Sequence, residues 1–330
     1  MRKLFFIFFV FALFSCDEKS ETKVITGNAL GTTYSVQFFT DRKFPVQHKI
    51  DSVFEAVNSS MSTYLPNSDI SKINKGKNNN LRVDEMFVEV FSLSKRIFRE
   101  TDGFFDPTVG NIVNYYGFGA ERVNAQELDS LMQFVGFNKV ELNKEKQILK
   151  TDPRVYIEFN AIGKGYAVDR IAAMLDHNSI DNYLVEVGGE LIAKGKDLQA
   201  NKDWYVGIDD PMQDKKRKLV KVIRLNNRAM ATSGNYRKFR VDSITGQKYV
   251  HTINPKTGLS KKSDLLSASV IANTCAEADA YATAFMAMGF QKSKKLVDKL
   301  SNIEVFFIYD EKGSLKKFST AGFKKMVVEK

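Results

Sequence analysis

Asp279 and Thr283 are the two residues whose types and spacing point most directly to chemistry. They stand four positions apart in the small-residue segment 276–288, which we expect to be helical, so both would lie on one helix face. A carboxylate and a hydroxyl placed in this way suit Mg²⁺, which prefers oxygen ligands and completes its shell with water and phosphate. A structural interpretation stays open, in which Asp279 caps the helix and Thr283 bonds to a backbone carbonyl.

A second candidate site is the junction between an expected strand at 155–159 and the helix that should follow it. Unpaired N–H groups and the helix dipole favour an anion at such a junction, and Gly163 and Gly165 would let a phosphate approach the backbone. Lys164 between them would neutralise the phosphate charge. Glycines at such a turn can also serve packing alone, so both interpretations are kept.

The third candidate is segment 251–258, a turn with Asn-Pro and Thr-Gly punctuation that presents His251 at its edge. A histidine there could deprotonate a hydroxyl nucleophile, and a structural histidine fits the turn equally well. Two loops with unusual polar and aromatic content accompany it: segment 61–66, whose tyrosine could stack on an aromatic ring, and segment 103–109.

Long helices mixed with hairpins must position these residues. Apolar residues recur at helical spacing in 46–60, and again after Asp84, which we expect to be an N-cap. Strands are expected at 32–39 and 265–272, and a strand–turn–strand unit at 183–193. This pattern predicts an α+β fold, one domain with mixed or antiparallel sheets and packed helices, in preference to a doubly wound sheet.

The N-terminus has the layout of a secretory signal, with two basic residues followed by an apolar run of eleven residues. Such a run is too short for a bilayer core, which takes about 20 residues. Segment 13–16 resembles a bacterial lipobox, in which Cys16 would carry lipid; an ordinary secretory signal is the alternative. We expect a periplasmic-side lipid anchor, at the inner membrane in preference to the outer, and three parts: a signal peptide at 1–15, a tether at 16–26 and one domain at 27–330.

Composition narrows the classes of partner and metal. The formal net charge of +10 falls to +8 when residues 1–15, with two basic residues and no acid, are removed. The basic residues form short runs far apart that do not alternate with aromatics, so no nucleic-acid partner is expected. With three histidines and, beside a lipidated Cys16, only Cys275, a zinc site of His and Cys is disfavoured and a hard ion held by oxygens is expected.

Eight segments resemble, in their order and in their amino-acid sequences, the motifs of the ApbE family, the FAD:protein FMN transferases. They run from about Gly27 to Gly289 and comprise Leu30–Val36, Met61–Tyr64, Gly103–Val109, Glu158–Asp169, Val187–Glu190, Ala231–Tyr236, His251–Gly258 and Ala278–Thr283. The chain departs from the family wording at Leu30, Glu158, 159–160 and Asn254, and at Ala282, where some members have a second acid.

The resemblance implies a T-fold-related, magnesium-dependent enzyme that takes FAD and transfers its FMN half to a threonine of another protein, releasing AMP. Mg²⁺ would be held by the Ala161 carbonyl, Asp279 and Thr283, while His251 and Lys164 would be the catalytic residues. The residues implied to bind FAD are Leu30, Tyr64, Phe104, Phe105, Asp106, Glu158, Lys164 and Ile253.

The implied partners are membrane-facing acceptor proteins with a target threonine, such as subunits of the sodium-pumping NADH:quinone reductase or of the Rnf complex. Two alternatives stay open on the sequence. One is an FAD pyrophosphatase, with water in place of the threonine, and the other is a non-enzymatic FAD-binding lipoprotein.

Overall fold

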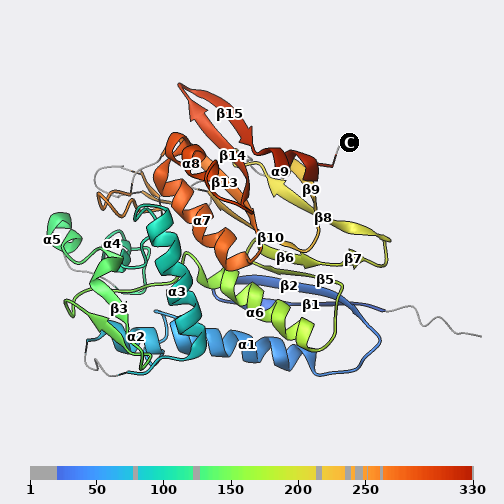
Figure 1. The fold of residues 1–330 in the computed structure, drawn as a ribbon, viewed down its shortest axis with the longest axis horizontal. Coiled ribbons are helices and arrows are strands. Elements are labelled where there is room, and N and C mark those ends of the chain that lie inside the picture. Colours follow the sequence, from blue (N-terminus) through green and yellow to red (C-terminus); the bar gives the residue numbers. More distant parts are fainter. Residues whose placement is uncertain are drawn as a thin grey trace, which may run out of the picture.

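An eight-stranded antiparallel sheet forms the centre of the molecule (Figure 1). The computed structural model describes residues 21–76, 81–121, 127–212, 218–234, 239–241, 248–250, 252–260 and 263–328. In spatial order the strands are β1 (Glu21–Ala29), β2 (Thr32–Thr40), β5 (Tyr183–Val187), β6 (Glu190–Lys194), β10 (Arg228–Gly234), β13 (Leu265–Ala272), β14 (Glu304–Glu311) and β15 (Ser314–Ser319). Every neighbouring pair in this sheet is antiparallel.

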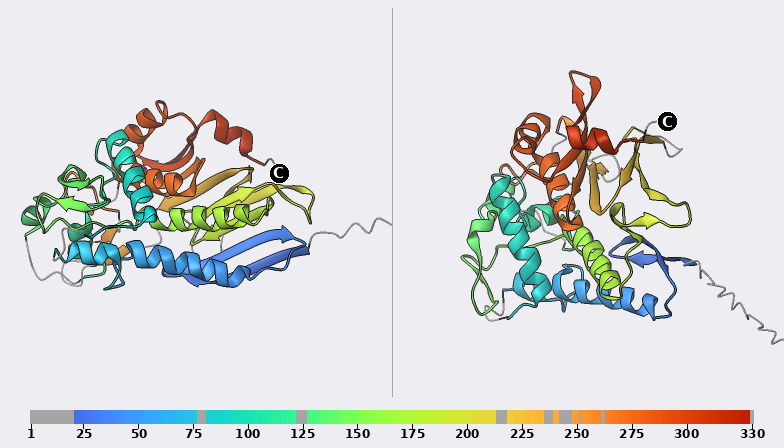
Figure 2. Two further views of the ribbon diagram at one scale, coloured as in Figure 1. Left: turned by 60° about the horizontal axis from the view of Figure 1, so that its bottom comes forward. Right: turned by 45° about the vertical axis from the view of Figure 1, so that its right-hand side comes forward.

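Four long helices build the main core on one face of the sheet: α1 (Val46–Met61), α3 (Glu85–Glu100), α6 (Gly163–His177) and α7 (Cys275–Met288). Helix α6 contacts β5 and β6, and α7 contacts β10 and β13 (Figures 1 and 2). Helix α1 packs against α6 and, through Phe54 and Tyr34, against β2, while α3 packs against α1 and α7. The opposite face buries a second cluster with a three-stranded sheet of β7 (Lys196–Asp197), β8 (Lys202–Asp209) and β9 (Leu219–Leu225). The fold is therefore α+β, as the sequence predicts.

The remaining elements are short. They are the strand pairs β3 (Val140–Leu142) with β4 (Ile148–Lys150) and β11 (Phe239–Val241) with β12 (Lys248–Val250), and the helices α2 (Asp69–Asn74), α4 (Gly110–Tyr115), α5 (Leu128–Met132), η1 (Phe137–Lys139), α8 (Phe290–Val297) and α9 (Ala321–Met326). Within the ranges given above, no helix has the length and apolar character to cross a bilayer.

Elements with strong local signals form where the sequence predicts them. The Asp84 side chain accepts a hydrogen bond from Phe87 N at 2.8 Å and caps α3, as expected from an N-cap residue. Strand β13 spans the predicted segment Leu265–Ala272, and strands β5 and β6 meet at a two-residue turn of Gly188 and Gly189, both with positive φ.

Segment 155–159, predicted to be a strand, is not one. It is buried, but its backbone is held outside the sheets by the side chain of Asn74. Asn74 Oδ1 accepts from Ile157 N at 2.8 Å, and Asn74 Nδ2 donates to Ile157 O at 2.7 Å. Glu158 N donates to Pro107 O at 2.8 Å. The apolar run correctly indicated burial, but such a run alone cannot separate a strand from an irregular buried segment.

The sheet begins earlier than predicted. Residues 21–26, predicted to belong to the tether, form most of strand β1, whose partners in β2 run from Glu21–Thr40 to Ala29–Thr32. The segment is polar because β1 is an edge strand with an exposed side, and its Thr22 hydroxyl donates to Gln199 Oε1 at 3.2 Å.

Candidate functional site

Lys164, Glu190 and Asp279 form a buried charged cluster, which we call the 164–190–279 cluster. The Lys164 ammonium lies 2.8 Å from Glu190 Oε1 and 3.8 Å from Asp279 Oδ2. Glu190 and Asp279 are 5% and 3% exposed, whereas the Lys164 side chain is 29% exposed, so two buried carboxylates meet one ammonium that is partly open to solvent. Lys164 belongs to α6, Glu190 to β6 and Asp279 to α7.

Strand alternation places Glu190 in this cluster. On β6, Leu191 and Ala193 point into the cluster of the opposite sheet face, so Glu190 and Ile192 point toward α6 and α7. Because Glu190 follows the Gly188–Gly189 turn directly, its side chain stands at the end of the hairpin, where Lys164 in the first turn of α6 can reach it.

Close packing of α6 against α7 brings Asp279 to the same place. Gly165 N donates to Asp279 Oδ2 at 3.1 Å, and a Cβ on Gly165 would lie 2.4 Å from the Cys275 carbonyl oxygen. One turn later, Asp169 accepts from Cys275 N at 2.7 Å and Ala276 N at 2.8 Å. Asp169 therefore satisfies two of the free N–H groups that begin α7.

Burial and mutual charge shift the titration of the cluster. Burial raises the pKa of the Glu190 carboxyl above its ordinary value, and the Lys164 ammonium opposes the shift. Burial acts to lower the pKa of Lys164, but the negative Asp279 and Glu190 outweigh it and hold that pKa above its ordinary value. Lys164 is therefore a charged group throughout the neutral range, and a positive group fixed beside buried carboxylates can attract an anionic ligand.

The N-terminus of α6 is less open to an anion than the sequence suggests. Gly163 N already donates to Phe159 O at 2.7 Å, and Gly165 N is taken by Asp279. Gly165 therefore serves helix packing, as one of the two sequence interpretations held. Gly163 differs, because a Cβ placed there would meet nothing within 4 Å, so space for a ligand lies beside Gly163 and the Lys164 side chain.

Asp279 does not cap α7, as the structural interpretation supposed, but it accepts from Gly165 N in the first turn of α6. Thr274 is the N-cap and accepts from Glu277 N at 3.3 Å, while Asp279 lies one turn further on. The Thr283 hydroxyl, four residues later, lies 3.5 Å from the Ser233 hydroxyl of β10. Carboxylate and hydroxyl oxygens thus line this side of α7, as expected from the i, i+4 spacing.

The oxygens around Asp279 fit a hard divalent cation. Two buried carboxylates face one ammonium, so the cluster carries an uncompensated negative charge. In the part of the chain that the structure describes, no three His, Cys, Asp or Glu side chains converge, so an ion here would also need hydroxyl, carbonyl, water or phosphate oxygens. That ligand mixture is the one Mg²⁺ commonly takes. Ala161, whose carbonyl was predicted to be a ligand, lies in the turn just before α6.

Glu158 and Tyr64, two predicted FAD-binding residues, lie near one another. Burial raises the pKa of the Glu158 carboxyl to about 7, and Asn160 Nδ2 donates to its Oε2. Partial burial and the charge of Glu158 both raise the pKa of Tyr64, whose ring is nonetheless 60% exposed. An exposed ring beside a buried acid can stack on a planar ligand while the acid accepts its N–H groups.

The raised pKa of Glu158 predicts a pH-dependent stability. The pKa of Glu158 is higher in the folded chain than in the unfolded one, so the folded state binds more protons between the two pKa values. The free energy of unfolding therefore falls as pH rises from about 4.5 through about 7. We expect Glu158→Gln to gain about 1–3 kcal/mol relative to the wild type across that window. Urea unfolding at several pH values checks this. The exposed Glu55→Gln is the control, and parallel curves for Glu158→Gln and the wild type would contradict the assignment.

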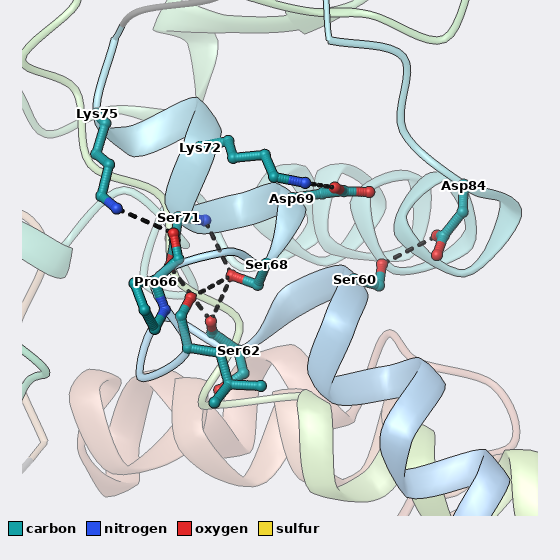
Figure 3. A network of polar contacts seen from close by, with 10 residues as sticks. Ser60, Ser62, Pro66, Ser68, Asp69, Ser71, Lys72, Lys75 and Asp84 are labelled. Carbon is teal, nitrogen blue, oxygen red and sulfur yellow. Dashed lines mark hydrogen bonds and ion pairs between the residues drawn. The ribbon is translucent and has the colours of Figure 1, made fainter.

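The loop that carries Tyr64 is held by a serine network (Figure 3). Ser68 Oγ donates to the carbonyls of Ser62, at 2.7 Å, and Leu65, at 2.9 Å, and accepts from Ser71 N at 3.2 Å as the N-cap of α2. Lys75 Nζ donates to Pro66 O at 2.9 Å. The backbone around Tyr64 is therefore fixed although its ring is exposed, which suits a preformed ligand contact.

The loop 103–109 is built largely for structure. Both Asp106 oxygens are used: Oδ1 accepts from Thr108 N at 2.8 Å and Thr108 Oγ1 at 2.6 Å, and Oδ2 accepts from Phe137 N at 3.1 Å. Phe105 is part of the main core. Phe104 is 6% exposed, and the ammonium groups of Lys256 and Lys292 lie 4.8 and 4.7 Å from its ring centroid.

Leu30 and Ile253 occupy different surroundings. Leu30 stands with Gly31 in the β1–β2 turn, both at positive φ, and packs at the margin of the main core. Ile253 is buried in a separate small cluster with Ile112 and Val113. The side chain of Ile253 is therefore used for packing, and a contact of either residue with FAD stays a prediction.

His251 and Cys16, the predicted base and the predicted lipidation site, lie outside the described residues. The predicted turn after His251 is present in the described residues 252–258. Asn254 Oδ1 accepts from Lys256 N at 2.9 Å, and Asn254 O accepts from Gly258 N at 2.8 Å.

Three residues of the site region lie in the motif segments but have no role predicted from the sequence: Glu190, Asp169 and Ser233. An acid directly after a Gly-Gly turn was the available signal for Glu190, since such a side chain stands at the end of a hairpin. No spacing argument could have paired it with Lys164, because the contact joins residues 26 positions apart through the sheet.

The fold and its central sheet are those of solved flavin transferases. The flavin transferase ApbE from Vibrio cholerae matches with a TM-score of 0.83 at 29% identity, covering 93% of this chain and 99% of that chain. The apo flavinyl transferase ApbE of Pseudomonas stutzeri matches with a TM-score of 0.81 at 26% identity, covering 93% and 97%.

Sequence comparison gives the same relationship. The family model of ApbE matches residues 30–307. A protein of Haemophilus influenzae named FAD:protein FMN transferase is 33% identical over 97% of this chain and 95% of its own, and one of Escherichia coli K12 with the same name is 30% identical over 98% and 95%. The chain belongs to the ApbE family.

Proposed function

We propose that this protein is an FAD:protein FMN transferase, which moves FMN from FAD to a threonine hydroxyl of an acceptor protein and releases AMP. The observation that carries the proposal is membership of the ApbE family over nearly the whole chain, with relatives of that name. The 164–190–279 cluster adds a site of the right chemistry, because a fixed ammonium and an uncompensated negative charge suit a phosphate ligand and its metal ion.

In the proposed reaction, the threonine oxygen attacks the phosphorus of the FMN half of FAD. A new P–O bond joins FMN to the acceptor, the P–O bond to the AMP half breaks, and AMP leaves with the electron pair of that bond. The hydroxyl proton passes to a general base, for which His251 is the proposed residue. Lys164 stabilises the negative charge on the pyrophosphate oxygens from its fixed position beside Asp279.

Mg²⁺ is the proposed metal, held by the Ala161 carbonyl, Asp279 and Thr283. When bound, it would neutralise phosphate charge and act as a Lewis acid on the pyrophosphate. The fit rests on the charge of the 164–190–279 cluster, in which Asp279 is 3% exposed, and on the hydroxyl of Thr283, which lies on the same helix and approaches the hydroxyl of Ser233. Ala282, which takes the place of a second acid, leaves a position that water can fill.

The flavin half is proposed to lie against Tyr64 and the loop of Phe104, near Glu158. The exposed Tyr64 ring offers a stacking surface, and the buried Glu158 offers an acceptor for a ring N–H. Glu158 N is hydrogen-bonded to Pro107 of the Phe104 loop, so these two parts of the site are joined directly.

The acceptor and the location of the enzyme complete the proposal. A lipid on Cys16 would hold the domain at the periplasmic face of a membrane, where subunits of the sodium-pumping NADH:quinone reductase or of the Rnf complex would present the target threonine. The support for this part is the sequence of segment 13–16.

The transfer is tested by incubating the protein with FAD, Mg²⁺ and the soluble part of an acceptor subunit. We expect flavin fluorescence to remain on the acceptor band after denaturation, with one AMP released per flavin bound, and to vanish when the target threonine is replaced by valine. Free FMN and AMP with an unlabelled acceptor would instead establish an FAD pyrophosphatase. Bound FAD that is never cleaved would leave only a flavin-binding protein.

A further inference from the structure

Glu190 has one carboxylate oxygen that the fold does not use. Oε1 pairs with Lys164 at 2.8 Å, whereas Oε2 is buried and has no hydrogen-bond partner among the described residues. An unsatisfied buried carboxylate oxygen costs free energy, so a glutamate here is not explained by stability. Val187, its partner across the hairpin, and Ile192, two positions along β6, show that apolar side chains are accommodated in the same core.

The geometry makes Glu190 the nearer of two competing partners of Lys164. The ammonium is 1 Å closer to Glu190 than to Asp279, at 2.8 against 3.8 Å. With Glu190 in place, Lys164 is held at the hairpin, and its ion pair with the Asp279 carboxylate is the longer of the two. With both carboxylates ionised, the cluster then carries two negative charges and one positive charge, which sum to −1.

We propose that Glu190 is a positioning residue that keeps the 164–190–279 cluster at a charge of −1 and so leaves Asp279 available to a divalent cation. This inference rests on the proposed function, since it concerns the same site. Without Glu190 the cluster would be neutral, and the Lys164 ammonium would pair with Asp279 and compete with the cation for its oxygens.

A series of four proteins tests the proposal by charge. The cluster carries −1 in the wild type, zero in Glu190→Gln, −2 in Lys164→Met and −1 again in the double variant. The probe is Mn²⁺ alone, with free ion measured by its electron paramagnetic resonance signal and no FAD present. We expect Glu190→Gln to weaken binding about tenfold, the double variant to return to within about threefold of the wild type, and Lys164→Met to bind more tightly than the wild type.

Glu186→Gln is the matched control. Glu186 lies on the same hairpin, and its Oε1 accepts from Gly189 N at 2.6 Å, so glutamine removes a negative charge outside the cluster while it keeps an acceptor for that contact. Mn²⁺ binding should stay within about twofold of the wild type. Thermal unfolding of all five proteins shows whether each variant is folded before its binding is compared.

Recovery of binding in the double variant is the decisive result, because a purely structural role of Glu190 would not be repaired by removing Lys164. The proposal is overturned if Glu190→Gln binds Mn²⁺ as the wild type does, or if Glu190→Gln and the double variant lose binding equally. Absence of Mn²⁺ binding in the wild type would overturn it as well. FMN transfer is assayed separately, so a wild type that binds Mn²⁺ in the predicted order but transfers no FMN would refute the proposed function and leave the role of Glu190 standing.

Discussion

Asp279→Asn is expected to reduce FMN transfer by at least about 10²–10³-fold, the loss typical of removing one group that stabilises charge in a transition state. The asparagine keeps the size of the side chain and can still accept from Gly165 N, which now donates to Asp279 Oδ2 at 3.1 Å. The variant therefore removes the charge that would hold the cation while leaving the contact between α6 and α7 in place.

The measurement is AMP release from FAD at saturating Mg²⁺ and acceptor, with thermal unfolding as the check on the fold. Glu277→Gln is the control, since Glu277 lies on the same helix and pairs with Arg96 away from the cluster. It should transfer FMN within about twofold of the wild type. An Asp279→Asn protein that keeps most of its activity would refute the metal site, whatever the fate of the transfer reaction itself.

Gly165→Ala is expected to destabilise the fold by about 2–4 kcal/mol, as overpacking against backbone does. The new Cβ would lie 2.4 Å from the Cys275 carbonyl oxygen and 2.9 Å from the Ala276 Cα, and neither atom belongs to a side chain that could turn away. Helices α6 and α7 would have to separate, and with them Lys164 and Asp279.

Gly163→Ala should have the opposite sign or no effect. It lies two positions earlier on the same helix, nothing lies within 4 Å of a Cβ placed there, and alanine favours a helix by up to about 1 kcal/mol over glycine. Urea unfolding of the two variants gives the comparison. Equal stabilities would show that the contact of α6 with α7 at Gly165 is looser than 2.4 Å implies.

Local signals in the sequence were sufficient for the helices and strands that depend on nearby residues. Helix α3 could be predicted because its cap, Asp84, and its apolar spacing lie within one segment, and β13 because eight buried residues stand together. Segment 155–159 was wrongly predicted to be a strand because its structure does not depend on nearby residues. Its backbone partners, Asn74 and Pro107, are about 50 or more residues away, and no local pattern reports them.

The candidate site divides in the same way. The i, i+4 spacing of Asp279 and Thr283 is a property of one helix, and both residues lie on α7, where the Thr283 hydroxyl approaches that of Ser233. Asp106 was predicted to bind FAD, but both of its carboxylate oxygens already accept hydrogen bonds, from Thr108 and Phe137. Whether an acid is free for a ligand depends on which N–H groups the folded chain brings to it.

By itself, the sequence determined the α+β class, the long helices and the membership of the ApbE family, because these follow from local spacing and from segments kept in a set order. Only the tertiary structure decided that Lys164 lies between Glu190 and Asp279 and that Gly165 is a packing residue. Those facts depend on how closely β6, α6 and α7 approach one another, and that approach is fixed by the packing of the whole core.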